Sequence, residues 1–216
     1  MARAGDKETV RTLLDEHGKT YAEEAGIRLK DTPQPLYELL VLSLLLSARI
    51  RASVAVAAAR ALFGAGMRSP KKMRDATWQQ RVDALGEGGY RRYDERTATQ
   101  LGDGAELVID RYGGDLRRLR EKADGDPEAI ARLLQEVPGI GPAGADIFLR
   151  EVQGVWKEAA PRLDGKALDG AEKLGLPKDG EKLAGLVEKD ELPAFAAALV
   201  RAALDKDIAE EVREGS

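Results

Sequence analysis

The chain has 216 residues, a formal net charge of −4, 43% hydrophobic residues and 33% charged residues, which is the balance of a soluble globular protein with one or two domains. It contains no cysteine and a single histidine, His17, which excludes disulfides, thiolate nucleophiles, cysteine-ligated zinc, cysteine-held iron–sulfur clusters and a histidine-based triad. The longest nearly apolar run, 39–48, is shorter than the ~20 residues that cross a bilayer. We therefore expect a cytoplasmic protein that makes no membrane contact and holds no metal through its side chains.

The apolar residues recur at helical spacing, so we predict an all-α fold. The predicted helices, in chain order, cover 7–25, 36–48, 52–63, 69–76, 78–85, 94–112, 116–122, 127–136, 142–151, 165–174, 179–188 and 191–206. Proline and glycine mark the connections between them. Residues 3–6 and 210–216 are predicted to be frayed ends. The helix at 36–48 is apolar nearly all round, which predicts that it forms the centre of the main core.

Basic residues gather in one part of the chain. Between 47 and 98 there are eleven Lys and Arg and five Asp and Glu, a surplus of +6, so the remaining residues carry −10. A basic face on an otherwise acidic protein can bind a polyanion such as DNA. An ordinary solvated helix surface would explain the same count.

The most informative stretch is a short turn between two predicted helices, Val137-Pro138-Gly139-Ile140-Gly141-Pro142. Proline suits the first turn of a helix, and the two glycines permit backbone conformations and close approaches that other residues resist. Free N–H groups at such a helix start bind anions, so Gly139, Gly141, Ala143 and Gly144 are candidate DNA-phosphate contacts. A tight αα-hairpin with a purely structural role is the alternative interpretation.

This turn resembles the helix-hairpin-helix of the superfamily of DNA glycosylases that includes endonuclease III. The superfamily pattern continues with a Gly/Pro-containing stretch and then an aspartate at a helix start, and Leu163-Asp164-Gly165-Lys166 matches it. Two upstream segments also resemble endonuclease III relatives: the apolar helix that ends in Leu-Leu-Ser-Ala-Arg at Arg49, and the Gly-rich turn before Tyr90. The resemblance spans about 35–177, although the Val-Asp-Thr-His-Val context usual around the aspartate is replaced here.

The resemblance implies two helical subdomains. One is a six-helix barrel over 36–150 that contains the helix-hairpin-helix at about 128–152. The other is a helical domain built from 1–35 and 151–216, with the catalytic aspartate at the interface. It further implies a monomer that acts on double-stranded DNA containing a lesion or mismatch, in the cytoplasm or nucleoid.

By the same resemblance, Asp164 is the catalytic residue: its carboxylate would stabilise the oxocarbenium-like charge on the deoxyribose and orient the attacking water. Judged without the resemblance, Asp164 is equally an ordinary helix N-cap. Relatives that also cleave the strand carry a lysine where this chain has Ala143, which predicts a monofunctional glycosylase. Lys166 is the nearby auxiliary candidate, with an exposed surface lysine as the alternative.

Glycosylases extrude the target base and fill the gap in the duplex. Arg49, Tyr90 and Arg91 match the positions that do this in relatives, although Arg49 replaces a common glutamine and Tyr90 could equally be a core aromatic. We expect no cofactor, because the cysteine-held iron–sulfur cluster of many relatives cannot form here. The resemblance leaves room for a monovalent cation on hairpin backbone carbonyls.

Two other functions stay open from the sequence. A non-catalytic helix-hairpin-helix DNA-binding protein would keep the turn and would not depend on Asp164. A bifunctional glycosylase and abasic-site lyase would use Lys166. The excised base is not encoded in any motif that we can identify.

Overall fold

The computed structural model describes residues 4–215, and these residues form helices and loops with no β-strand among them. The predicted all-α class is therefore confirmed. The chain divides into two compact units: Ala22–Leu149 form the larger unit, and residues up to Tyr21 join those from Arg150 onward in the smaller one. Among the described helices, none combines the length and apolarity that a membrane crossing requires.

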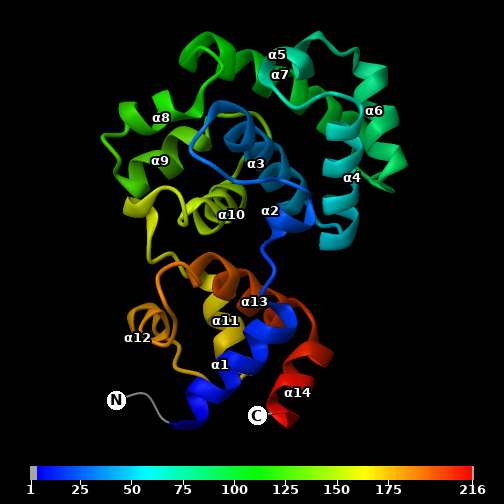
Figure 1. Ribbon diagram of the computed structural model, residues 1–216. Helices are drawn as coiled ribbons and strands as arrows, with labels where there is room; N and C mark the ends of the chain where they lie inside the picture. Colours follow the sequence, from blue (N-terminus) through cyan, green and yellow to red (C-terminus); the bar gives the residue numbers. More distant parts are fainter. Residues whose placement is uncertain (1–3, 216) are drawn as a thin grey trace. The chain divides into compact units, whose positions relative to one another are not determined.

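The larger unit is built around α3. All residues from 36 to 45 are buried, and α3 packs against α4 and α8 (Figure 1). The predicted position of this apolar helix at the centre of the core is confirmed. The helices of this unit are α2 (Tyr21–Glu24), α3 (Pro33–Leu46), α4 (Ala52–Gly64), α5 (Pro70–Asp75), α6 (Trp78–Glu87), α7 (Asp94–Tyr112), α8 (Leu116–Lys122), α9 (Pro127–Leu134) and most of α10 (Pro142–Val152).

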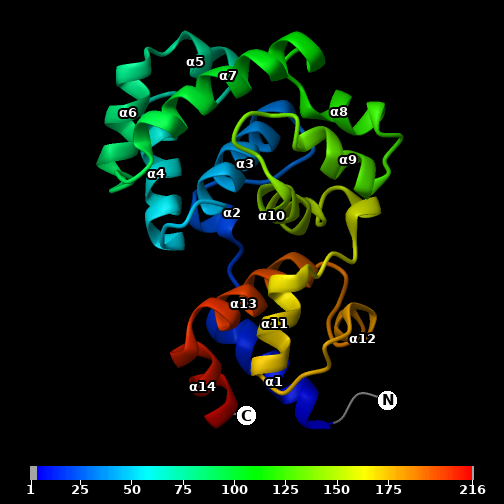
Figure 2. The same ribbon diagram turned by 180° about the vertical axis from the view of Figure 1, so that it is seen from behind.

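The longest helix, α7, runs along α5 and α6 (Figure 2). Thr77 begins α6 with a capping box, in which its hydroxyl accepts from the N–H of Gln80 and the Gln80 amide oxygen accepts from the N–H of Thr77. Arg81, on α6, is buried and donates through Nη1 to the carbonyls of Met73 and Ala76, at 2.9 and 3.0 Å. Burial lowers the pKa of Arg81. This arginine therefore serves the structure of the unit.

The boundary between the units differs from the predicted one. Residues 22–35 were expected to lie with the terminal segments, but they pack into the larger unit. Two interactions hold them there: Arg60 Nη1 donates to the carbonyl of Glu24 at 3.0 Å, and Arg120 Nη1 contacts Asp31 Oδ2 at 3.2 Å. Both partners lie far along the chain, so the sequence pattern near the boundary did not reveal them.

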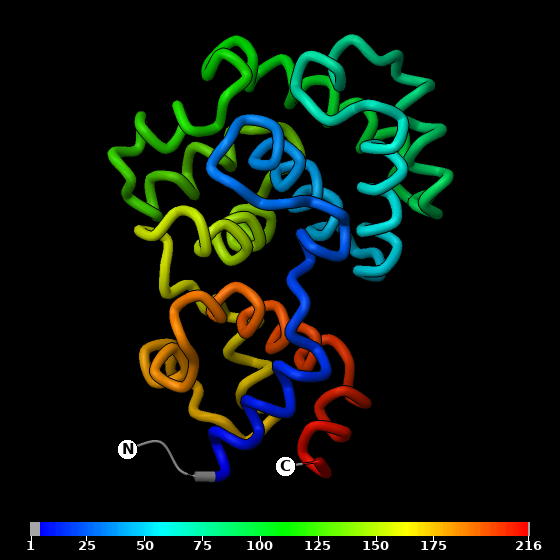
Figure 3. The backbone as a smooth tube through the Cα atoms, viewed as in Figure 1, coloured from blue at the N-terminus to red at the C-terminus, as the bar shows by residue number. Residues whose placement is uncertain are grey.

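The smaller unit consists of α1 (Ala4–His17), a 3₁₀ turn (Lys157–Ala159), α11 (Gly165–Lys173), α12 (Gly180–Ala184), α13 (Leu192–Leu204) and α14 (Lys206–Glu214). Helix α13 is central and packs against α11, α1 and α14, while the terminal helices α1 and α14 lie side by side (Figure 3). Gly170 lets α11 approach α13 closely, because a Cβ there would lie 1.8 Å from the Leu199 carbonyl oxygen. This packing fixes the helix that follows Asp164.

Two predictions at the ends of this unit were wrong. The predicted helix 7–25 is broken after His17, where the Gly18 N–H donates to Leu14 O and α1 stops. The predicted frayed ends are helical within the described residues: α1 begins at Ala4, and α14 is capped by Asp205 and buries Val212 against the unit. Tertiary packing holds these segments in helices. Arg3 and Ser216 lie outside the described residues.

Candidate active site

The turn between α9 and α10 is anchored to the core of the larger unit. Val137 and Ile140 are buried, and the Ile140 N–H donates to the Val137 carbonyl at 3.0 Å. Gly139 has a φ of +90°, and a Cβ there would lie 2.8 Å from Leu44 Cδ1 and 2.9 Å from Gln100 Oε1. A glycine at 139 is therefore favoured by the backbone conformation, and a larger residue there would also have to displace the ends of two side chains.

Gly141, two residues later, is under neither constraint. Its φ is not positive, and a Cβ there would meet nothing within 4 Å. Ala143 is exposed, whereas Gly144 is buried against Ile140. The Ala145 N–H already donates to the Gly141 carbonyl, so the first-turn N–H groups at Ala143 and Gly144 are the ones that the helix itself leaves without an i−4 acceptor. The turn thus offers the donors that an anion site needs, beside an open position at Gly141.

Asp164 is the N-cap residue of α11 and is almost fully buried. Its Oδ1 accepts a hydrogen bond from the Ala167 N–H at 3.0 Å, so the N-cap interpretation is correct as far as local structure goes. Its Oδ2 accepts from Arg150 Nη1 at 2.6 Å. The Asp164 and Arg150 side chains are only 6% and 4% exposed. The candidate catalytic carboxylate is therefore half of a buried ion pair.

The end of α10 supplies a second tether to the segment before Asp164. Gln153 is buried, and its amide nitrogen donates to the carbonyls of Arg150 and Arg162, at 2.8 and 2.9 Å. Its amide oxygen accepts from the Arg162 N–H at 2.9 Å. The backbone two residues before Asp164 is therefore fixed to α10 on both its donor and its acceptor side.

Sequence reasoning missed both Arg150 and Gln153. The available signal was their place next to apolar residues, Ile147-Phe148-Leu149 and Val152. The structure buries every residue from 147 to 153, and polar side chains inside such a run must find buried partners. Periodicity alone does not say which partner they find.

Lys166 lies on the surface. Its side chain is 52% exposed, and Nζ lies 4.0 Å from Asp169 Oδ2 on the same helix. This is the environment of an ordinary surface lysine, because nothing excludes water from the amine. The geometry favours the alternative that the sequence left open for this residue.

The three residues proposed to enter the duplex differ in burial. Arg49 and Arg91 are exposed. Tyr90 is 1% exposed, and its hydroxyl lies 3.0 Å from Thr97 Oγ1; burial raises the pKa of this phenol. Tyr90 is therefore a core aromatic, as the alternative interpretation had it, and in this structure it does not reach a surface.

The next tyrosine along the chain, Tyr93, lies at the surface and was missed. The guanidinium carbons of Arg92 and Arg96, both exposed, lie 5.3 and 5.0 Å from the centre of the Tyr93 ring. We call residues 91–96 the 91–96 patch: its three arginines are exposed, two of them lie against the Tyr93 ring, and Asp94 and Glu95 in the same segment offset part of their charge. Such a cluster suits contact with phosphates and exposed bases.

Not all of the basic surplus between 47 and 98 is available to a ligand. Arg81 is buried, Arg68 is paired at 2.7 Å with the buried carboxylate of Glu38, and Arg74 contacts Asp75 at 3.0 Å. The charge count therefore overestimated the strength of a basic face. The exposed remainder includes Arg49 and the 91–96 patch.

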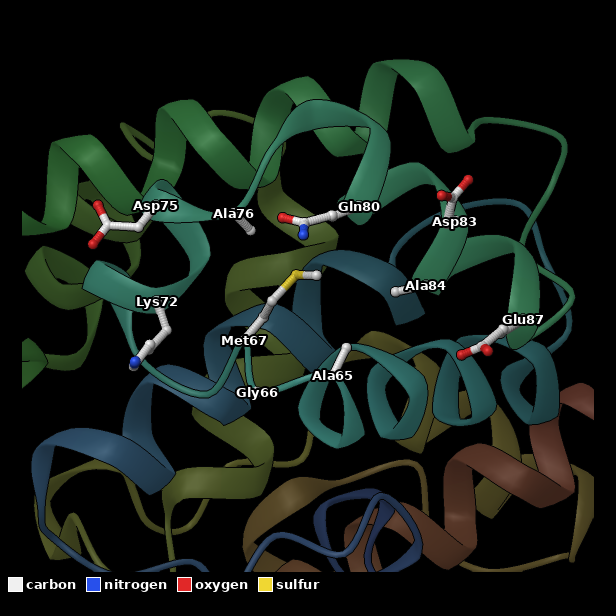
Figure 4. A pocket seen from close by; sticks show the side chains of 10 residues that line it. All are labelled: Ala65, Gly66, Met67, Lys72, Asp75, Ala76, Gln80, Asp83, Ala84 and Glu87. Atoms are coloured by element: carbon white, nitrogen blue, oxygen red, sulfur yellow. The ribbon is translucent and has the colours of Figure 1, made fainter.

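An open cavity of about 530 Å³ lies beside α5 and α6. Figure 4 shows Asp83 and Glu87 on α6 and Lys72 and Asp75 on α5 around it. Three carboxylates against one ammonium make this cavity unsuited to phosphate. Neither Asp164 nor the hairpin turn lines it, so it is separate from the candidate active site.

One group among the described residues has the chemistry of metal ligands. Glu16, His17 and Glu211, on α1 and α14, each place one ligand atom within 4.8 Å of the others. Two of the three are exposed carboxylates, which commonly gather at surfaces without an ion. We assign no metal site there.

Comparison with known proteins places the fold. No known protein family and no curated protein matches the chain by sequence. Among solved structures, a trapped covalent intermediate of endonuclease III with DNA matches over 93% of this chain and 86% of that one, with a TM-score of 0.51 and 19% identity. The chain has the endonuclease III fold. A non-covalent endonuclease III–DNA complex matches over the same shares of both chains at a TM-score of 0.52 and 17% identity.

A thermostable thymine-DNA glycosylase matches over 93% of this chain and 88% of that one, with a TM-score of 0.54 and 18% identity. The fold expected from the helix-hairpin-helix resemblance is thus confirmed. At identities this low, the likeness to endonuclease III shows architecture, and the chemistry has to be argued from the residues.

Proposed function

We propose that the protein is a DNA glycosylase of base-excision repair that hydrolyses the N-glycosidic bond of a damaged or mismatched base and does not cleave the strand. The observation that carries this proposal is a carboxylate with a buried side chain, Asp164, at the helix start that the glycosylase motif specifies, in a chain with the endonuclease III fold. Its partner would be double-stranded DNA, bound by a monomer without a cofactor.

In the proposed reaction the base is first extruded from the duplex. As the bond from C1′ to the base nitrogen breaks, positive charge develops on the sugar, and the Asp164 carboxylate stabilises it. The base departs with the bonding electron pair, and a water molecule oriented by the same carboxylate adds its oxygen to C1′; the proton that this water loses neutralises the departing base anion. The products are a free base and an abasic site.

The proposal that the strand is not cleaved rests on the two motif positions at which an amine was considered. A lyase needs an uncharged amine that attacks C1′. Ala143 has none, and Lys166 is exposed beside Asp169. Water is therefore the nucleophile that we propose.

For the duplex, we propose that N–H groups at the start of α10 hold a phosphate and that the open position at Gly141 lets the backbone come close to it. Arg49 and Arg91 would contact the duplex near the extruded base, as the motif positions imply. The 91–96 patch takes over the role considered for Tyr90, because the half-buried ring of Tyr93 lies close to two guanidinium groups.

The test is base excision from labelled duplexes containing uracil or thymine opposite guanine, adenine opposite oxidised guanine, alkylated purines or oxidised pyrimidines. Each is read with and without alkali for the wild type and for Asp164→Asn, with Asp169→Asn as the matched control because Asp169 is an exposed carboxylate on the same helix. We expect breakage only after alkali, lost in Asp164→Asn and kept in Asp169→Asn. Thermal unfolding of each variant separates lost chemistry from lost folding.

One observation favours a second candidate, a non-catalytic DNA-binding protein. Both carboxylate oxygens of Asp164 already accept structural hydrogen bonds, so the residue has a reason to exist without catalysis. Duplex binding with no excision of any base in the panel would support this candidate. Strand breakage without alkali, with borohydride trapping of an abasic site, would instead support a lyase that uses Lys166.

A further inference from the structure

The pairing of Asp164 with Arg150 exceeds what helix capping requires. Aspartates also cap α8, α9, α12 and α14, through Asp115, Asp126, Asp179 and Asp205. Where a cation contacts one of these, it is an exposed neighbour in sequence: Arg117 beside Asp115 and Lys182 beside Asp179. Asp164 alone among these five caps has a buried cation as its partner.

Such a pair is costly to build, so its presence needs a reason. Removing two charges from water carries a desolvation penalty that a single ion pair barely offsets. The Arg150 Nε is buried as well and finds no acceptor within the described chain. A neutral N-cap such as serine would begin α11 without this penalty. What the pair achieves is a carboxylate that is held in one orientation with little of its side chain open to solvent.

Arg150, in the last turn of α10, and Gln153, which follows that helix directly, both act on the Asp164 segment. Arg150 holds Oδ2 of the carboxylate, and Gln153 holds the backbone at Arg162. The Ala167 N–H holds Oδ1 from the other side. Each carboxylate oxygen thus accepts a hydrogen bond from a different donor, and the backbone before Asp164 is held as well. The carboxylate therefore has little freedom to rotate.

We propose that Arg150 is the positioning residue of the reaction, a role that rests on the proposed glycosylase function. It fixes the orientation of the Asp164 carboxylate and aims the lone pairs that neither Arg150 nor Ala167 occupies at the reacting sugar. Because its own positive charge lies beside the carboxylate, Arg150 also weakens the attraction of Asp164 for the developing cation. The net benefit is therefore one of geometry. Without Arg150, the carboxylate would attract the developing cation more strongly but would be free to move.

The test uses Arg150→Lys and Arg150→Gln, with Arg213→Met as the control because Arg213 is an exposed arginine of the same unit. Lysine retains the charge without the planar fork, and glutamine retains an N–H donor without the charge. Single-turnover excision at saturating protein is measured on a duplex that the wild type cuts, and duplex affinity is measured separately. Thermal unfolding shows which variants are folded.

We expect the excision rate to fall about 10-fold in Arg150→Lys and about 100-fold in Arg150→Gln, with duplex affinity unchanged within about 3-fold. If Arg150→Gln is unfolded, Arg150→Lys provides the test: its excision rate should fall while its duplex affinity stays unchanged. A folded variant that excises at the wild-type rate, or one whose entire loss lies in duplex affinity, overturns the role of Arg150 alone. A wild type that excises nothing from the panel overturns the proposed function, and this role with it.

Discussion

The hairpin turn and the start of α11 carry the two halves of the glycosylase motif, and the fold uses them differently. At the hairpin, the fold favours a glycine at 139 but places no constraint on Gly141, whose missing side chain faces open space. At the start of α11, both oxygens of Asp164 serve the structure through the Ala167 N–H and Arg150. Packing therefore explains Asp164 but not Gly141. The second half of the motif also contains an unconstrained glycine, Gly165, where an added Cβ would meet nothing within 4 Å.

This difference decides how much each half says about function. A motif residue without a structural role points to a ligand, so Gly141 is independent support for contact with DNA. A motif residue with a structural role is compatible with either function, so Asp164 supports catalysis only through the fold and its position in the motif. Substitutions that separate structural from functional effects test the comparison directly.

The largest effect is expected at Asp164. Asp164→Asn keeps an N-cap side chain but leaves Arg150 as an unpaired buried cation, which should lower the free energy of unfolding by about 3 kcal/mol. Chemical denaturation measures it. The double variant Asp164→Asn/Arg150→Met should recover part of this loss, because it removes the orphaned charge.

Asp126→Asn is the matched control, since Asp126 caps α9 from an exposed position; we expect a change within about 0.5 kcal/mol. An Asp164→Asn variant as stable as the wild type would mean that the ion pair contributes nothing to folding. Asp164, like Gly141, would then have no demonstrated structural role, and the difference that we describe between the two regions would not exist.

The next largest effect is expected at Gly139. Gly139→Ala forces an L-residue to a φ of +90° and pushes a Cβ against Leu44 and Gln100, which should lower the free energy of unfolding by about 2 kcal/mol. Denaturation again measures it. A neutral substitution would show that the turn can relax, and would remove the structural explanation for this glycine.

Gly141→Ala sharpens the same comparison within one turn. The added methyl group meets no atom of the chain within 4 Å, so stability should change by no more than about 0.5 kcal/mol. Duplex affinity at fixed salt should fall about 10-fold if DNA backbone approaches this position, equivalent to about 1.4 kcal/mol. Unchanged affinity would show that the open space at Gly141 is not used by DNA.

The parts of the molecule that could be predicted from sequence are those set by local pattern. The apolar helix at the centre of the larger unit is confirmed, because a segment apolar on every side can only be enclosed. The hairpin was equally visible, because Pro fixes the backbone and Gly permits turn conformations that other residues resist. The early end of α1 and the assignment of 22–35 to the larger unit depend on packing between distant segments, and no local pattern encodes it.

The candidate site divides in the same way. Asp164 was found through its motif, whereas Arg150 was not, because an arginine near the end of a helix is ordinary until the fold buries it opposite a carboxylate fourteen residues along. Tyr90 and Tyr93 show the same limit. Both follow the Gly-rich turn, and only the structure shows that Tyr90 faces Thr97 in the core while Tyr93 lies between two arginines.

The smallest effect is expected at Lys166, which adjoins the buried pair but is itself exposed. Lys166→Ala should leave excision within about 2-fold of wild type and stability within about 0.5 kcal/mol, because its contact with Asp169 is an exposed ion pair. Borohydride should trap no covalent complex with an abasic duplex. A complex that is trapped by the wild type and lost in Lys166→Ala would contradict this expectation. The start of α11 would then supply both the carboxylate and the nucleophile of the reaction.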